Sequence, residues 1–257
     1  MDFKLKEKRV LITGSSRGIG AAIAVEFLHE EAKTCIVSRG SKNLYKLEAL
    51  LKTQFGKDNI ISRECDCTKQ SSLNNLSENI KNNWGGLDIL VINVGDGRSV
   101  DVALPDNDDW KNTWHNNFES ALNTARAFLP LLKESHGNIL FISSIAGIEV
   151  IGAPVDYSTA KAAIIALAKN MAKKLAKEVR VNVIAPGNIL FPGGVWDQKI
   201  QKKSKKIQEM IDATVPMQRF GVPEDVAGAA VFLCSEKASF ITGSVLTIDG
   251  GQTSSIF

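Results

Sequence analysis

Short apolar segments alternate with longer helical patterns along the whole of this 257-residue chain. The short segments are rich in β-branched residues, which is typical of parallel strands buried on both faces. Strands are predicted at Val10–Thr13, Thr34–Val37, Asn59–Arg63, Ile89–Val94, Ile139–Ile142, Arg180–Ile184 and Val245–Ile248. Helices are predicted at Gly20–Glu30, Asn43–Phe55, Ser72–Asn83, Asp109–Leu132, Tyr157–Ala176, Gln198–Ala213 and Pro223–Cys234.

This alternation predicts an α/β fold, because repeated strand–helix units form a parallel sheet with helices on both faces. We expect a Rossmann-like, doubly wound sheet of about seven strands. No linker, low-complexity stretch or internal repeat divides the chain, so residues 1–257 are predicted to form a single domain. The longest interruption of the pattern follows the sixth strand. Long insertions at the carboxyl ends of strands bind ligands in such sheets, so residues 188–221 are predicted to form a substrate lid.

The composition of the chain limits the kinds of partner that it is expected to bind. A hydrophobic content of 44% and a charged content of 23% are typical of a globular protein. The net charge of +3 is too small to indicate nucleic acid or a membrane surface as a partner. No segment approaches the ~20 apolar residues that span a bilayer, and the first residues lack the apolar core of a signal peptide. We therefore expect a cytoplasmic protein.

The four cysteines fit the same compartment. Cys35, Cys65, Cys67 and Cys234 do not have metal-ligand spacing, so no metal site is expected. A chain of this length does not need disulfides for stability, and we expect the thiols to be reduced and buried.

Three glycines, Gly14, Gly18 and Gly20, join the first predicted strand to the first predicted helix. A helix N-terminus offers unpaired N–H groups and the positive end of its dipole to a phosphate. Glycine allows the backbone to turn tightly and to approach that phosphate. The Gly-x3-Gly-x-Gly spacing differs from the common Gly-x-Gly-x-x-Gly. Its position between a strand and a helix favours a dinucleotide site over an ordinary turn.

The end of the second predicted strand indicates which dinucleotide binds. NAD-binding folds place an acidic residue there for the ribose 2′-hydroxyl, whereas this chain has Ser38 and Arg39. A carboxylate would repel a 2′-phosphate, but a guanidinium pairs with it in a bidentate manner. Arg17, in the glycine loop, is a second candidate for this phosphate. The arginines favour NADP(H) over NAD(H); the alternative is that both are solvated surface residues.

Tyr157 and Lys161 lie four residues apart in a predicted helix, so their side chains share one face. A phenol with a pKa near 10 is a poor acid or base at neutral pH. A neighbouring ammonium stabilises the phenolate, and we expect Lys161 to lower the pKa of Tyr157 for acid–base catalysis. Ser144 directly follows the fifth strand and can donate a hydrogen bond to a substrate oxygen that gains charge in the transition state.

With these residues in place, the chain resembles the short-chain dehydrogenase/reductase family over nearly its whole length. The glycine motif of the family matches Thr13–Gly20, and its serine, tyrosine and lysine match Ser144, Tyr157 and Lys161. Further matches are the helix asparagine, the acidic residue after the third strand, the Pro-Gly turn and the closing Ile-Asp-Gly-Gly. These fall at Asn117 (with Asn116 as second choice), Asp66, Pro186-Gly187 and Ile248–Gly251.

The resemblance implies reversible hydride transfer between NADP(H) and a carbonyl or secondary alcohol. It implies catalytic roles for Asn117, Ser144, Tyr157 and Lys161, with a water held by Asn117, and a homotetramer joined by the long helices and the last strand. The residues expected to bind the cofactor are Gly14, Ser16, Arg17, Gly18, Ile19, Gly20, Ser38, Arg39, Asp66, Cys67, Asn93, Val94, Gly95, Tyr157, Lys161, Pro186, Gly187 and Ile189.

Two segments depart from the family pattern. Ile92-Asn93-Val94-Gly95 replaces the usual Asn-Asn-Ala-Gly turn, so the first asparagine is lost. Phe191 stands where many members carry a threonine that contacts the nicotinamide carboxamide, so another group must hold it. Phe191–Gly194 is either a plain turn or a shaped wall of the substrate pocket.

The substrate has two leading candidates. The first is a 3-oxoacyl thioester on an acyl carrier protein or coenzyme A, although Gly95–Ser99 is not typical of such reductases. The second is a sugar, nucleotide sugar or polyol. A third hypothesis, a non-catalytic NADP-binding regulator, leaves the intact Ser144, Tyr157 and Lys161 without a purpose.

The predicted lid carries five lysines close together. They form either a solvated helix face or a guide for an anionic substrate. Trp196 and Met217 are candidates to line the pocket. The lysines are Lys199, Lys202, Lys203, Lys205 and Lys206.

Overall fold

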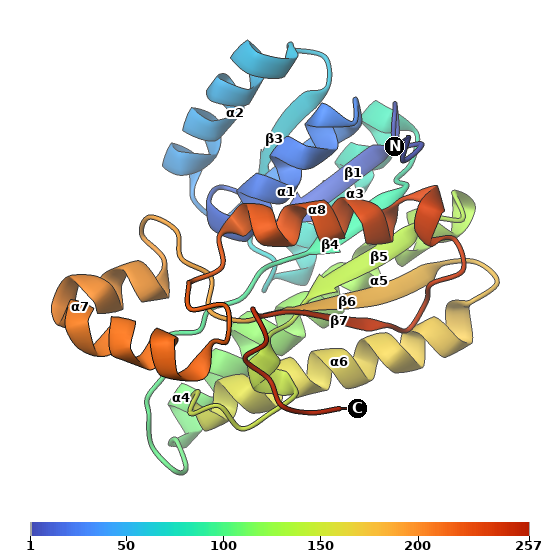
Figure 1. Cartoon of the computed structure of the whole chain (residues 1–257). Helices are drawn as coiled ribbons and strands as arrows, with labels where there is room; N and C mark the ends of the chain where they lie inside the picture. Colours follow the sequence, from blue (N-terminus) through green and yellow to red (C-terminus); the bar gives the residue numbers. More distant parts are fainter. Residues whose placement is uncertain (1, 257) are drawn as a thin grey trace.

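Seven parallel strands form one sheet in the order β3-β2-β1-β4-β5-β6-β7. The computed structural model describes residues 2–256 (Figure 1); Met1 and Phe257, the two ends of the predicted domain, lie outside the described residues. The order reverses between β1 and β4, which confirms a doubly wound sheet. The strands are β1 Arg9–Thr13, β2 Lys33–Ser38, β3 Ile60–Glu64, β4 Ile89–Ile92, β5 Asn138–Ile142, β6 Arg180–Pro186 and β7 Val245–Ile248.

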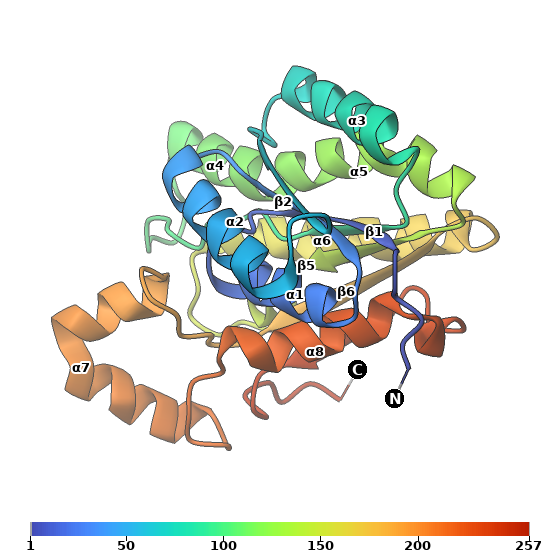
Figure 2. The ribbon, with the colours of Figure 1, turned by 90° about the horizontal axis from the view of Figure 1, so that it is seen from above.

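Helices cover both faces of the sheet (Figure 2). In β1, Val10 and Ile12 pack towards α1 and α8, whereas Leu11 packs towards α3, α5 and α6. Two apolar clusters therefore form, one on each face, and the predicted α/β fold is confirmed. The helices are α1 Gly18–His29, α2 Ser41–Phe55, α3 Gln70–Trp84, α4 Asn107–Trp114, α5 Ser120–Glu134, α6 Val155–Leu175, α7 Val195–Thr214 and α8 Pro223–Cys234.

The helix predicted at Asp109–Leu132 is not a regular α-helix along its whole length. It is divided into α4 and α5 by a π-helical turn at His115–Glu119. The apolar periodicity continues across this turn, so the sequence pattern does not reveal it. Asn117 lies in the wide turn, and π-helical turns often occur at functional sites.

The strand predicted at Ile89–Val94 ends earlier, at Ile92. The Asn93 side-chain amide donates to the carbonyl oxygens of Thr13 and Gly14, at 3.2 and 3.0 Å. These bonds turn the chain away from the sheet and tie the end of β4 to the end of β1.

The insertion, residues 188–221, leaves the sheet directly after β6 and contains α7. Its two ends pair with each other at the base: Leu190 N–H donates to Gly221 O at 2.8 Å, and Gly221 N–H donates to Asn188 O at 3.0 Å. From there α7 projects beyond the sheet and bends (Figures 1 and 2). The bend falls at Lys203, whose backbone angles (φ −148°, ψ 52°) are not helical.

Candidate active site

A cavity of about 800 Å³ opens at the carboxyl ends of the strands, at the point where the strand order reverses. Open α/β sheets bind their ligands in this crevice. The structure brings almost all of the predicted cofactor and catalytic residues to the wall of this cavity. Gly18, Gly20 and Asn117 are the exceptions, because none of them lines the cavity.

The glycine loop needs its glycines for two different reasons. Gly14 and Gly18 have φ angles of +63° and +58°, in the left-handed region that favours glycine. A Cβ atom on Gly20 would lie 2.7 Å from the carbonyl oxygen of Gly14 and 2.6 Å from Nδ2 of Asn93. Gly20 therefore lets α1 pack closely under the loop and does not itself face the cavity.

The N-terminus of α1 is suited to a phosphate. Arg17 occupies the capping position, and its side chain makes no hydrogen bond to the first turn. The first N–H groups of the helix and the helix dipole are thus available to an anion beside the cavity. A dinucleotide pyrophosphate fits this donor set.

Basic side chains gather at the adenosine end of the cavity, where β2 ends. Arg17 and Arg39 both line it and are exposed. Lys42, in the first turn of α2, also lines it and was not predicted, although it lies three residues after Arg39. Asp66 lines the same end, and its side chain accepts from Thr68 N–H at 3.1 Å and Thr68 Oγ1 at 2.7 Å.

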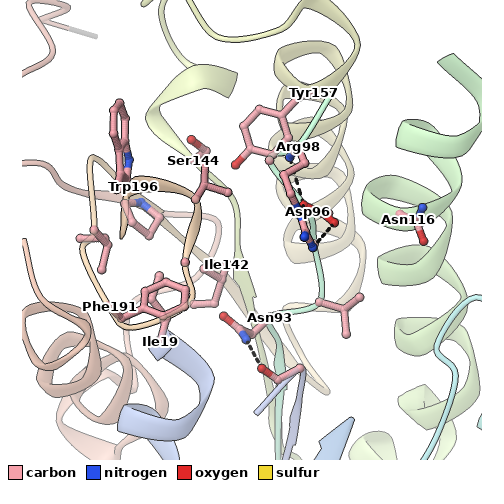
Figure 3. A pocket seen from close by; sticks show the side chains of 18 of the residues that line it. Ile19, Asn93, Asp96, Arg98, Asn116, Ile142, Ser144, Tyr157, Phe191 and Trp196 are labelled. Atoms are coloured by element: carbon pink, nitrogen blue, oxygen red, sulfur yellow. Dashed lines mark hydrogen bonds and ion pairs between the residues drawn. The ribbon is translucent and has the colours of Figure 1, made fainter. Parts of the chain in front are cut away.

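Ser144, Tyr157 and Lys161 meet on one wall of the cavity. Ser144 follows β5 and starts a 3₁₀ turn, with its Oγ accepting from Ala146 N–H at 3.1 Å. Tyr157 lies in the first turn of α6, and its hydroxyl group faces that of Ser144 (Figure 3). Lys161, one turn later, is buried; its Nζ lies 5.7 Å from the centre of the Tyr157 ring and donates to Ile142 O at 3.3 Å.

Burial moves the pKa values of this acid and this base in opposite directions. It raises the pKa of Tyr157; hydrogen bonding with Ser144 opposes that rise and the negative charge of Asp96 adds to it. Burial lowers the pKa of Lys161 to about 8. The expected net lowering of the Tyr157 pKa was therefore wrong, because desolvation of the phenol outweighs the favourable contacts.

Asn117 is fully buried and clamps the loop that follows β4. Its Oδ1 accepts from Asp96 N–H, and its Nδ2 donates to Asp96 O, both at 3.1 Å. Nδ2 also donates to Thr113 O at 2.9 Å. Asn116 does line the cavity, but its amide is bonded to Asn112. Gly95 permits the close approach, since a Cβ there would lie 2.9 Å from both Asn117 Oδ1 and Lys161 Nζ.

Sequence reasoning missed an ion pair beside Tyr157. Arg98 Nε and Nη2 donate to the two carboxylate oxygens of Asp96 at 2.9 and 2.8 Å, and both residues line the cavity (Figure 3). Gly97, between them, lies against the Tyr157 ring. The unusual Gly95–Ser99 segment was the signal, but its residues could not be assigned to a wall without the fold.

A second missed pair comes from two distant segments. Asn188 Nδ2 donates to Gln252 Oε1 at 2.9 Å, and both side chains line the cavity. Gln252 follows the last strand, and nothing in its sequence context indicates a site.

The insertion supplies an aromatic wall. Phe191, at the position of the expected threonine, packs on Gly18 and beside Ile19 (Figure 3). Trp196 lines the cavity, with Lys199 Nζ 4.5 Å above its ring. Met217 does not line it and is 61% exposed, whereas the unpredicted Met210 does line it.

The other four lysines of α7, Lys202, Lys203, Lys205 and Lys206, are exposed, and none forms an ion pair within residues 2–256. All four cysteines are free and buried. The part of the chain that the structure describes has no cluster of three metal-ligating side chains. It also has no helix long and apolar enough to cross a membrane.

Known proteins match this chain over most of its length. A family model described as enoyl-(acyl carrier protein) reductase matches residues 14–253. A 3-oxoacyl-[acyl-carrier-protein] reductase of Aquifex aeolicus is 36% identical, with 98% of this chain and 100% of the relative covered. A tropinone reductase homolog of Arabidopsis thaliana is 35% identical, with 98% and 93% covered.

Among solved structures, the L-sorbose reductase from Gluconobacter frateurii, complexed with NADPH and L-sorbose, superposes with a TM-score of 0.93. It is 31% identical, and each chain is covered completely. The family model covers the glycine loop, the catalytic wall and strands β2 to β7, and these relatives cover 98% or more of the chain. The chain therefore belongs to the short-chain dehydrogenase/reductase family of oxidoreductases.

Proposed function

We propose that this enzyme reduces a ketone to a secondary alcohol with NADPH as the hydride donor. The observation that carries the proposal is the convergence of Ser144, Tyr157 and Lys161 on one wall of the cavity. Burial raises the pKa of Tyr157, so the phenol is protonated at neutral pH. The protonated phenol can act as the general acid of the reduction, with its proton transfer favoured by the charge that grows on the carbonyl oxygen and by the charge of Lys161.

The cofactor would lie between the glycine loop and the Ser144 wall. The pyrophosphate would meet the N-terminus of α1, and the 2′-phosphate would meet Arg17 and Arg39, with Lys42 close by. Bound NADPH supplies the hydride. Phe191 has no hydroxyl for the carboxamide, so the backbone next to Ile189 is the proposed replacement.

The residues of the chain then handle the proton. Ser144 Oγ would donate a hydrogen bond to the carbonyl oxygen, and Tyr157 would give its proton to that oxygen as the carbon receives the hydride. The products are the alcohol, NADP⁺ and a transient phenolate. The charge of Lys161 would stabilise the phenolate. The phenolate would regain its proton from solvent through Lys161 and a water held at Asn117.

The first candidate substrate is a 3-oxoacyl thioester. Lys199 at the aromatic wall and the exposed lysines of α7 would attract the anionic group of a carrier or of coenzyme A. The second candidate is a sugar or polyol. Asp96, Arg98 and Gln252 favour it, because carboxylate, guanidinium and amide groups together recognise hydroxyls.

The test is a substrate panel, followed by NADPH absorbance, with acetoacetyl thioesters, ketoses, nucleotide sugars and polyols. Turnover of a thioester, with a KM that rises with salt, is expected for the first candidate. Turnover of ketoses alone favours the second. Tight NADPH binding with no turnover of any carbonyl would favour a regulator and contradict the proposal.

A second experiment tests the cofactor. Arg39→Asp places a carboxylate beside the 2′-phosphate, so KM for NADPH should rise about tenfold or more while KM for NADH falls. Steady-state kinetics with both cofactors measure this. An unchanged KM for NADPH would show that Arg39 is only a solvated surface residue.

We also propose that the insertion, residues 188–221, is a substrate lid, and that the enzyme is a cytoplasmic homotetramer. The position of the insertion over the cavity supports the first point. The apolar side chains exposed along the edge of β7 support assembly.

A further inference from the structure

Arg17 lies between two parts of the molecule that the function must bring together. It belongs to the glycine loop and lines the adenosine end of the cavity. Its Nη1 donates to the carbonyl oxygen of Gly193 in the insertion at 3.0 Å. A single side chain thus faces the expected 2′-phosphate and also holds a segment 176 residues away.

The Gly193 peptide is also fixed to α7. Its N–H donates to Asp197 Oδ2 at 2.8 Å, and its carbonyl oxygen accepts a second hydrogen bond from Gln198 Nε2 at 3.3 Å. Asp197 and Gln198 lie in the first turns of α7. A displacement of the Gly193 backbone should therefore also move the start of α7, the helix that carries Trp196 and Lys199.

A second contact joins the same two segments. The ring of Phe191 lies so close to Gly18 that a Cβ atom there would be 2.7 Å from it. The insertion thus rests on the glycine loop at two adjacent points, Phe191 on Gly18 and Gly193 on Arg17. The apolar contact sets the position, and the hydrogen bond is the part that a charged ligand can influence.

We propose that Arg17 is a positioning residue that couples recognition of the 2′-phosphate to closure of the insertion over the substrate. A guanidinium has five N–H donors, and the Gly193 bond uses one of them. The remaining donors can pair with a phosphate at the same time. Binding of a phosphate orders this long, exposed side chain. The hydrogen bond from Arg17 to the insertion then no longer carries the entropy cost of ordering the side chain, so the two contacts strengthen each other.

This coupling rests on the proposed NADP(H) function and extends it. It means that NADP(H) should close the insertion more than NAD(H) does, independently of any contact with the nicotinamide. The coupling also works in reverse, since a closed insertion should bind the 2′-phosphate more tightly.

Limited proteolysis with trypsin, read by mass spectrometry, tests the coupling without catalysis. The exposed lysines of α7 are the reporter sites, and Lys57, in the exposed turn after α2, is the reference site. The probes are adenosine 2′,5′-bisphosphate and 5′-ADP, which both lack nicotinamide, each at a saturation measured by titration. We expect the 2′,5′-bisphosphate to slow cleavage in α7 by about fivefold or more, with 5′-ADP giving little protection and Lys57 unaffected.

Two variants separate the link from phosphate binding alone. Arg17→Met should lose the protection even when the 2′,5′-bisphosphate is saturating. Arg39→Met, which removes a phosphate ligand that does not contact the insertion, should keep it once saturated. Equal protection by both probes in the unmodified enzyme, or full protection in Arg17→Met, would overturn the coupling while leaving the NADP(H) assignment intact. Failure of the 2′,5′-bisphosphate to bind at all would overturn both.

Discussion

Tyr157 and Lys161 share one buried environment, which shifts their pKa values in opposite directions. The low polarity disfavours both charged forms, the phenolate and the ammonium. It therefore raises the pKa of Tyr157 and lowers the pKa of Lys161. The phenol is kept protonated, and it needs the charge of Lys161 to stabilise the phenolate that forms when it gives up its proton. The lysine is left with a charge that is lost near pH 8, within the range where the enzyme can be assayed.

Replacing Tyr157 with Phe tests the proton donor. The hydroxyl is removed and the ring is kept, so turnover should fall by about 10²–10⁴-fold while the Kd for NADPH stays nearly unchanged. Turnover assays and NADPH fluorescence titration measure the two quantities. Undiminished turnover would contradict the assignment of Tyr157 as the acid.

The pH profile tests Lys161. Its pKa lies at about 8, below the usual 10.5, so the ammonium is present below that pH and is lost as the pH rises through it. If the ammonium stabilises the phenolate, kcat/KM for reduction should fall as the pH rises through about 8. Lys161→Met should be slow and should lack this descending limb. A profile of the unmodified enzyme that stays level well above this pH would remove the charge of Lys161 from the mechanism.

Among the elements, the junction of β1, α1 and β4 carries most of the geometry of the site. Asn93 ties the end of β4 to Gly14, and Gly20 brings α1 underneath both. The π-helical turn between α4 and α5 then places Asn117 against the loop that continues from β4. The wall of the cavity is thus built from contacts between element ends and not from any single element.

Gly20→Ala tests this packing. The added Cβ would lie within 3 Å of Gly14 O, Ser15 Cα and Asn93 Nδ2, so it should lower the free energy of unfolding by about 1–3 kcal/mol. Urea unfolding measures the loss. The matched control is Gly228→Ala in α8, where a Cβ meets nothing within 4 Å and better helix propensity should add about 0.5–1 kcal/mol. Equal effects of the two substitutions would show that the glycine loop is not tightly packed.

At the scale of the whole molecule, one edge of the sheet is left uncovered. β7 is the terminal strand, and Val245 and Leu246 on it are 36% and 37% exposed. Phe240, shortly before it, is fully exposed. An apolar strand edge invites pairing with another chain. A second apolar strip runs along α4 and the π-helical turn that follows it. Its partly exposed rings pack one against the next, and they belong to Trp110, Trp114 and Phe118.

These surfaces predict a homotetramer. Light scattering should give the mass of four chains, and Leu246→Glu should shift it to a smaller assembly because a carboxylate cannot be buried unpaired at the contact. Lys57→Glu, an exposed charge change next to β3 at the opposite edge of the sheet, is the control. A monomeric unmodified chain would contradict the assembly.

The sequence alone was enough to predict the architecture of the fold and most of the cofactor and catalytic residues that line the cavity. Strand and helix periodicities report burial within each element, and the carboxyl ends of parallel strands must meet at one edge, so the positions of Ser144, Tyr157 and the glycine loop follow from local patterns. The π-helical turn, the Asp96–Arg98 pair beside Tyr157 and the bond from Arg17 to Gly193 were decided only by the tertiary structure. The direction of the Tyr157 pKa shift was also decided only by the tertiary structure. Desolvation of the phenol depends on every neighbour that excludes water and not on the lysine four residues away.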